Sequence, residues 1–164
     1  MILKTRHFGE IEIDDSLAVT FEDGLPGFEK VKKFAFIYQE DDTLFAWMQS
    51  IDDPNLAFAV VDPFSVKKDY DVVIDDETLR RLEIEGSEDV QVFAIVVIPE
   101  DIKKISMNLK APVIVNRKKG KGMQRILDTD KYSVRHYILD ELQGQGVAEN
   151  AGSDKEEKSV NRTK

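Results

Sequence analysis

The stretch KFAFIYQEDDTLFAWMQSIDDPNLAFAVVD, residues 33–62, decides the fold class of this chain. It contains three runs rich in aromatic and β-branched residues, at 33–38, 44–50 and 55–62, with polar, turn-like residues between them. Aromatic and β-branched residues favour strands, whereas Asp, Asn and Pro favour turns. Three strands are therefore expected to follow one another with no helix between them, which is typical of an antiparallel sheet.

The same pattern continues on both sides of this stretch. In Leu17–Phe21, large apolar residues occupy every second position, so they share one face of a strand. RKKGKG, at 117–122, joins two apolar runs and is interpreted as a hairpin tip. Many short strands at this spacing predict a mainly β fold, a small antiparallel β-barrel-like single domain. The further strands are expected at 11–13, 90–98, 111–116 and 123–128.

One or two short helices complete the predicted domain. Asp76–Glu85 has an acidic first turn, apolar residues three positions apart and Gly86 as a stop signal. The stretch 100–105 is the second candidate. From Gln143 onward the chain shows no apolar periodicity, so it cannot bury enough surface to offset the entropy of ordering. We therefore predict a domain at 1–142 and a disordered tail at 143–164.

Composition narrows the class of protein. The chain has no cysteine, which permits a reducing compartment, and neither a membrane-length apolar run nor a secretory signal is visible. A cytoplasmic location is therefore expected. Residues 1–102 carry nine Lys or Arg against 24 Asp or Glu, whereas residues 103–139 carry ten against two. Such an acidic body disfavours nucleic-acid binding and favours a basic partner.

Residues that could support catalysis are scarce. His7 and His136 are the only histidines, and no HExxH, GxSxG or cysteine nucleophile is present. The chain is therefore predicted not to be an enzyme and to need no cofactor, metal, membrane or small-molecule substrate. An enzyme that uses two carboxylates stays an alternative. Paired aspartates fall at the predicted ends of elements, where they favour turns and caps over metal binding: Asp14-Asp15, Asp41-Asp42, Asp52-Asp53 and Asp75-Asp76.

GLPGFE, at 24–29, fits a structural corner. With Pro26 second and Gly27 third, residues 25–28 satisfy a type II turn, whose third position requires a positive φ. Gly24 adds freedom before the turn, and Phe28 is expected to point inward and close one end of the barrel. Nucleic-acid binding at this loop is disfavoured, because acidic residues flank it.

The sequence KDYDVVIDDE, at 68–77, is the most informative surface candidate. If 69–75 is extended, Asp69, Asp71, Val73 and Asp75 share one face, and the other face is apolar. Three carboxylates around one exposed valine suit contact with a basic protein surface that has an apolar spot. The alternative is an edge strand whose charges only prevent aggregation.

The basic hairpin 117–125 indicates an alternative function. It could touch RNA or a membrane surface as part of a nucleic-acid-binding β-barrel. It lacks the interleaved aromatic residues that stack on bases, however, and it could instead complement the acidic body within the molecule.

Several stretches together resemble the FliW family of flagellar assembly factors. The likeness covers about residues 1–139, and the matching stretches follow in the family's order. These are AVTFEDGLPGFE (18–29), FAWMQSIDDPNLAFAVVDPF (45–64), KDYDVVIDDETL (68–79) and NLKAPVIVNRKKGKGMQRILD (108–128).

The resemblance implies a small β-barrel-like protein that is not an enzyme. Such proteins bind flagellin in the cytoplasm and, once flagellin has been exported, bind CsrA, a basic RNA-binding translational repressor. We expect 69–75 to contact the repressor and its negative field to oppose RNA phosphates. An apolar groove with a polar rim is expected for the amphipathic segments of flagellin, although the sequence does not indicate its residues.

Overall fold

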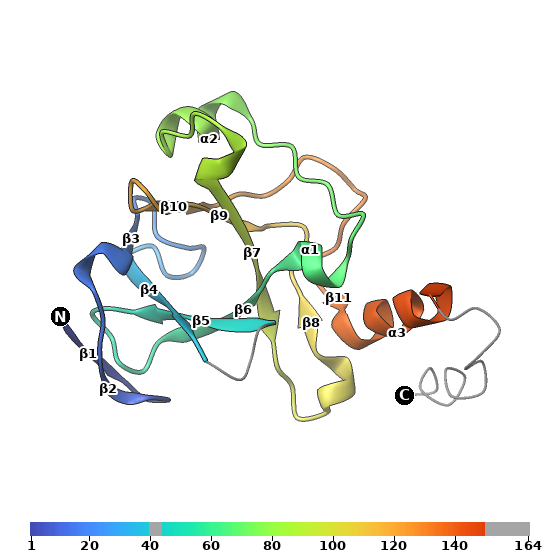
Figure 1. Ribbon diagram of the computed structural model, residues 1–164, viewed down its shortest axis with the longest axis horizontal. Helices are drawn as coiled ribbons and strands as arrows, with labels where there is room; N and C mark the ends of the chain where they lie inside the picture. The colour runs from blue at the N-terminus through green and yellow to red at the C-terminus, as the bar shows by residue number, and fades with distance from the viewer. Residues whose placement is uncertain (40–43, 150–164) are drawn as a thin grey trace.

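A computed structural model describes residues 1–39 and 44–149, and the fold is mainly β as predicted (Figure 1). Within these residues, seven strands form a closed ring in the order β7-β6-β5-β4-β3-β10-β9, and β9 pairs back onto β7. The ring consists of β3 (Ala18–Phe21), β4 (Lys33–Tyr38), β5 (Phe45–Ser50), β6 (Ala57–Val61), β7 (Val90–Val97), β9 (Val113–Asn116) and β10 (Lys121–Gln124).

Pairing within the ring is antiparallel with one exception. Strand β10 runs parallel to β3, with Lys121 opposite Thr20 and Gly122 opposite Phe21. This parallel pair closes the barrel between the first strand of the ring and the hairpin near its end. A Cβ at Gly122 would lie 2.8 Å from the Phe21 ring, so glycine allows the close approach.

Alternate residues of the strands enter two separate cores. In β6, Val60 joins a cluster inside the barrel, whereas Ala59 and Val61 join a second cluster on its outer side. Inside the barrel, Phe36 stacks on Phe93 with ring centroids 4.6 Å apart. The two clusters explain why these strands are apolar on both faces, as expected for strands buried on both sides.

The remaining strands lie outside the ring. Strands β1 (Ile2–Thr5) and β2 (Gly9–Glu12) form a separate antiparallel hairpin. Strands β8 (Ser106–Met107) and β11 (His136–Tyr137) extend the sheet beyond β7. Strands β1, β8 and β11 were not predicted from the sequence.

The helices differ from prediction in number and in length. They are α1 (Pro63–Val66), α2 (Asp76–Arg81) and α3 (Ile138–Glu149), with 3₁₀ turns η1 (Asp15–Leu17), η2 (Ser87–Asp89) and η3 (Ile102–Lys104). The second candidate helix, at 100–105, is therefore the short turn η3.

The predicted tail boundary at Gln143 is wrong, because α3 continues to Glu149. Ile138 is buried in the outer cluster, and Leu139 and Leu142 pack against it. This packing supports the start of a helix that propensity alone does not predict, because Gly144 and Gly146 follow. The rest of the predicted tail, 150–164, lies outside the described residues.

The GLPGFE corner is a type II turn, as predicted. Phe28 N–H donates to the Leu25 carbonyl at 2.7 Å, and Gly27 has φ +85°. Gly24 also has a positive φ, +65°, and a Cβ there would lie 2.6 Å from the Phe28 carbonyl oxygen. The predicted inward plug is wrong: Leu25 is 2% exposed, whereas Phe28 is 39% exposed and packs edge-on against Phe58.

Candidate functional site

The acidic segment, residues 69–75, links α1 to α2 and is not a strand of the sheet. Its predicted alternation is present, because Tyr70 is buried, Val72 and Ile74 are half-buried, and Asp71 and Val73 are exposed. Within the described residues, however, the backbone groups of Val72, Val73 and Ile74 form no hydrogen bond. The segment is therefore an extended connection, and the alternative interpretation, an edge strand, is wrong.

Two tyrosines anchor the acidic segment where it leaves α1. The Tyr70 hydroxyl donates to the Leu109 carbonyl at 2.7 Å, and burial raises the pKa of Tyr70. Asp71 N–H donates to the Tyr132 hydroxyl at 2.8 Å. The two rings meet edge to face, with centroids 4.7 Å apart. These contacts hold the segment in place without a sheet ladder.

Two of the predicted binding carboxylates already have partners inside the molecule. Asp69 forms a 2.9 Å ion pair with Lys67, which lowers the pKa of Asp69 and raises that of Lys67. Asp75 is the N-cap of α2 and accepts the Thr78 N–H at 2.9 Å. Thr78 holds the pKa of Asp75 below its ordinary value, and an ion pair with Arg125 adds to the effect.

Asp71 and Val73 are the members of the acidic segment that remain open to a partner. Among the described residues, the Asp71 side chain forms no hydrogen bond or ion pair, and Val73 is 78% exposed. They line a surface hollow of about 460 Å³ together with Arg125, Ile126 and residues of the loop that follows. Of the four residues predicted to bind a partner, Asp69 and Asp75 thus have internal ion pairs, whereas Asp71 and Val73 have none within the described residues.

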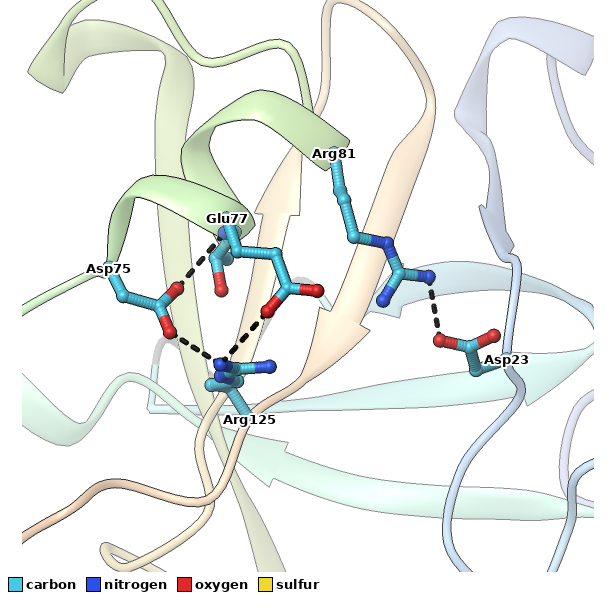
Figure 2. Close-up of polar contacts among 6 residues, drawn as sticks. Asp23, Asp75, Glu77, Arg81 and Arg125 are labelled. Carbon is cyan, nitrogen blue, oxygen red and sulfur yellow. Dashed lines mark hydrogen bonds and ion pairs between the residues drawn. The ribbon is translucent and has the colours of Figure 1, made fainter.

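Arginine contacts at both ends fix α2, the helix that follows the acidic segment (Figure 2). Arg125 lies against the first turn of α2 and pairs with Asp75 and with Glu77, the latter at 3.4 Å. At the other end, Arg81 pairs with Asp23 at 2.6 Å, beside the GLPGFE corner. The helix has six residues and would be marginal alone, so these contacts position it.

Helix α2 ends before the predicted stop at Gly86. Glu83 takes a positive φ of 55°, its N–H donates to the Arg80 carbonyl, and Ile84 N–H donates to the Leu79 carbonyl. This is the Schellman arrangement, with a glutamate where glycine is usual. Buried Asn116 supports it, because its Nδ2 donates to the carbonyls of Leu82 and Glu83 at 2.8 and 3.1 Å.

An apolar groove of about 670 Å³ lies on the other side of the acidic segment. Val72 and Ile74 of the acidic segment line it, and so do Val90–Phe93 of β7. Leu79 and Ile84, from α2 and the turn after it, also line the groove. Figure 1 shows α2 beside the start of β7 and the connection from α1 that ends in this helix.

The basic hairpin is used largely within the molecule. Lys118 pairs with Asp89 at 2.9 Å, Lys121 pairs with Glu83, and Arg125 pairs with the first turn of α2. Arg117 donates to Gln91 and to Tyr38. The intramolecular reading of this hairpin is therefore confirmed.

Most of the aspartate pairs act as caps and turn residues. Asp14 accepts from Ser16 N–H and Asp53 accepts from Asn55 N–H, while Asp41 and Asp42 lie outside the described residues. Across 1–39 and 44–149, no group of three or more His, Asp or Glu side chains is arranged to hold a metal ion. None of the helices in those ranges is long and apolar enough to cross a membrane.

The family assignment comes from comparison with known proteins. The family model described as FliW protein matches residues 2–138. The chain belongs to the FliW family. The flagellar assembly factor FliW of Ruminiclostridium cellulolyticum is 54% identical over 148 residues, which cover 90% of this chain and all of that protein. The FliW of Caldicellulosiruptor saccharolyticus is 46% identical, covering 86% of this chain and 92% of its own length.

A solved FliW structure has the same fold. The crystal structure of the flagellar assembly factor FliW superimposes with a TM-score of 0.79 at 35% sequence identity, covering 84% of this chain and 96% of that chain. The predicted resemblance to FliW proteins is therefore confirmed.

An apolar groove was expected from the family resemblance, but its place in the fold was not predicted from the sequence. The alternation of Tyr70, Val72 and Ile74 indicated an apolar face, but this was interpreted as an ordinary core face. The fact that β6 ends at Val61, before it can cover the first residues of β7, was not readable from either strand alone.

Proposed function

We propose that this chain is a cytoplasmic flagellar assembly factor that binds flagellin as a chaperone-like partner and alternately binds and antagonises CsrA. Partner exchange would then couple flagellin synthesis to flagellin export. Membership of the FliW family supports this proposal, since the relatives are named flagellar assembly factors. The flagellin part rests on family membership, and no catalytic activity is proposed.

The observation that best supports the repressor contact is that Asp71 and Val73 share the exposed face of the acidic segment. An unpaired carboxylate beside an exposed apolar side chain suits a basic surface with an apolar spot. Asp69 and Asp75 flank the pair and add negative field, although each already has an internal cation. The acidic residues 1–102 extend that field.

A charge reversal tests this contact. Asp71→Lys should weaken CsrA binding at least tenfold in a calorimetric titration, because it places a cation against a basic partner. Glu12→Lys is the matched control: it makes the same change in net charge at an exposed site on β2. Equal effects of the two substitutions would mean that only the net charge of the chain affects binding. If Asp71→Lys does not change CsrA binding, the proposed contact at Asp71 is ruled out.

If the negative surface of this chain releases RNA from CsrA by electrostatic repulsion, the release should depend on salt concentration. The negative surface near bound CsrA should repel RNA phosphates, and screening limits such repulsion to about 10 Å at ~0.1 M salt. RNA release measured with the complex kept saturated should therefore weaken as salt rises. Release that stays constant across the salt range would point to direct blocking of the RNA site.

The nucleic-acid-binding alternative is disfavoured. It needs the hairpin 117–125 to contribute to a larger positive face, and Lys118, Lys121 and Arg125 are already paired with carboxylates.

A further inference from the structure

The edge of β7 is open where it lines the apolar groove. Strand β7 pairs with β9 over Val90–Phe93, but its pairing with β6 covers only Ala94–Val96, because β6 ends at Val61. In an antiparallel ladder, alternate residues direct their N–H and C=O groups to opposite sides. Some backbone groups in Val90–Phe93 therefore point away from β9, toward the groove. The Val90 N–H donates to the Ser87 carbonyl, and no strand among the described residues receives the others.

The acidic segment, which also lines the groove, is unpaired backbone as well. Val72, Val73 and Ile74 are extended, yet their N–H and C=O groups form no hydrogen bond within the described residues. Two lengths of backbone with free hydrogen-bonding capacity thus line the same apolar groove. An open edge of this kind is the template for addition of a strand.

The charge of the groove favours an occupant with a cationic residue. Its polar rim includes Asp62 and Glu85, and no Lys or Arg side chain lines it in the part of the chain that the structure describes. The acidic segment also lines the groove, and the acidic first turn of α2, with Asp76 and Glu77, begins where that segment ends. A peptide with a lysine or arginine beside its apolar residues complements this rim.

We propose that the groove binds an extended segment of a partner protein, which adds a strand to the open edge of β7. Alternate apolar side chains of that segment enter the groove, and a cationic residue lies near Asp62 or Glu85. The length of the added strand is set by the open edge Val90–Phe93, which spans about 13 Å at ~3.3 Å per residue. This inference stands on the groove alone and does not depend on the identity of flagellin or CsrA as partners.

An extended occupant fits better than a helix because of its backbone. A helix satisfies its own N–H and C=O groups, so it would leave those of β7 and of the acidic segment without partners. An added strand supplies the missing groups on at least one side. The volume, about 670 Å³, falls within the ~300–1,000 Å³ typical of ligand sites.

A random linear peptide library displayed on phage, selected on the purified full chain, identifies the occupant. Ile74→Glu places a carboxylate in the groove, whereas Ile102→Glu makes the same change at an exposed site on η3, outside the groove. The enriched peptides should alternate apolar residues with period two and include lysine or arginine. Ile74→Glu should reduce their affinity at least tenfold, and Ile102→Glu should leave it within about twofold.

Amide hydrogen exchange tests the added strand itself. Saturation with a selected peptide should slow exchange within residues 72–74 or 90–93, and N-methylation of alternate peptide residues should abolish binding. The proposal would be overturned if the selection enriches no peptide, or if the enriched peptides space their apolar residues as a helix does. Equal loss of peptide affinity in the two variants would also overturn it. Self-association blocked by Ile74→Glu would instead assign the groove to a second copy of this chain. CsrA binding lost only with Asp71→Lys would leave the function proposed above intact.

Discussion

The backbone N–H of Asp71 donates a hydrogen bond to the hydroxyl of Tyr132, 61 positions further along the chain. The contact joins the acidic segment to the loop between β10 and β11, and it takes the place of the strand pairing that this segment lacks. The segment can therefore present Asp71 and Val73 to solvent on one side and Val72 and Ile74 to the groove on the other.

Removing this hydroxyl should loosen the segment more than it destabilises the fold. Tyr132→Phe keeps the ring against Tyr70 and should lower the free energy of unfolding by about 0.5–1.5 kcal/mol. Urea denaturation measures that loss, and amide exchange at Asp71 should quicken by more than global stability explains. Unchanged exchange at Asp71 would show that the hydrogen bond does not hold the segment.

The two glycines of the GLPGFE corner should differ in their tolerance of alanine. Gly27→Ala meets only the cost of a positive φ, about 1–2 kcal/mol, because nothing lies within 4 Å of its added Cβ. Gly24→Ala also drives a Cβ into the Phe28 carbonyl, so it should be clearly more destabilising in thermal or urea unfolding. Equal losses would contradict this account of the corner.

Asn116 should be important for the position of α2. Its side chain is 1% exposed and satisfies the Leu82 and Glu83 carbonyls at the end of the helix. Asn116→Leu should therefore lower the free energy of unfolding by about 1–3 kcal/mol, because it leaves a buried carbonyl unpaired. A neutral result in urea denaturation would mean that the Schellman turn holds without this contact.

Asp75 should contribute to the acid sensitivity of the fold. Its pKa in the folded chain is lowered, first by Thr78 and then by Arg125, so its stabilising effect is present above the unfolded pKa of about 3.9 and is lost as pH falls through the folded value. Asp75→Asn keeps an N-cap but cannot titrate. The stability difference between wild type and Asp75→Asn should shrink below about pH 4 in urea denaturation.

The matched control for this titration is the neighbouring residue. Asp76→Asn removes a carboxylate that forms no ion pair with the described residues. If both variants reduce the loss of stability at low pH equally, the contacts of Asp75 with Thr78 and Arg125 are not its cause.

The β architecture was predictable because local sequence patterns indicate its strands. The runs 33–38 and 44–50 have the residue types of strands, and the matching strands β4 and β5 begin or end within about one residue of them. The pairing that closes the barrel was not predictable in detail. It brings Gly122 against Phe21 across about a hundred residues, and no local pattern encodes that parallel contact.

The candidate site shows where prediction fails for physical reasons. The alternation from Tyr70 to Ile74 is present, but whether a segment joins a sheet depends on a neighbouring strand, and none lies beside it among the described residues. The partners of Asp69 and Asp75 differ in the same way, because Lys67 is local in sequence whereas Arg125 is brought there by the fold. Counting carboxylates therefore overestimated the charge available to a partner.

The central claim, that this chain exchanges flagellin for CsrA, is tested most directly by a displacement titration. Monomeric flagellin is added to a preformed complex of this chain with CsrA, and free CsrA is measured by analytical ultracentrifugation. The account predicts that CsrA is released in step with flagellin binding and recovers its RNA binding. CsrA that stays bound at saturating flagellin, or a stable complex of all three proteins, would contradict it.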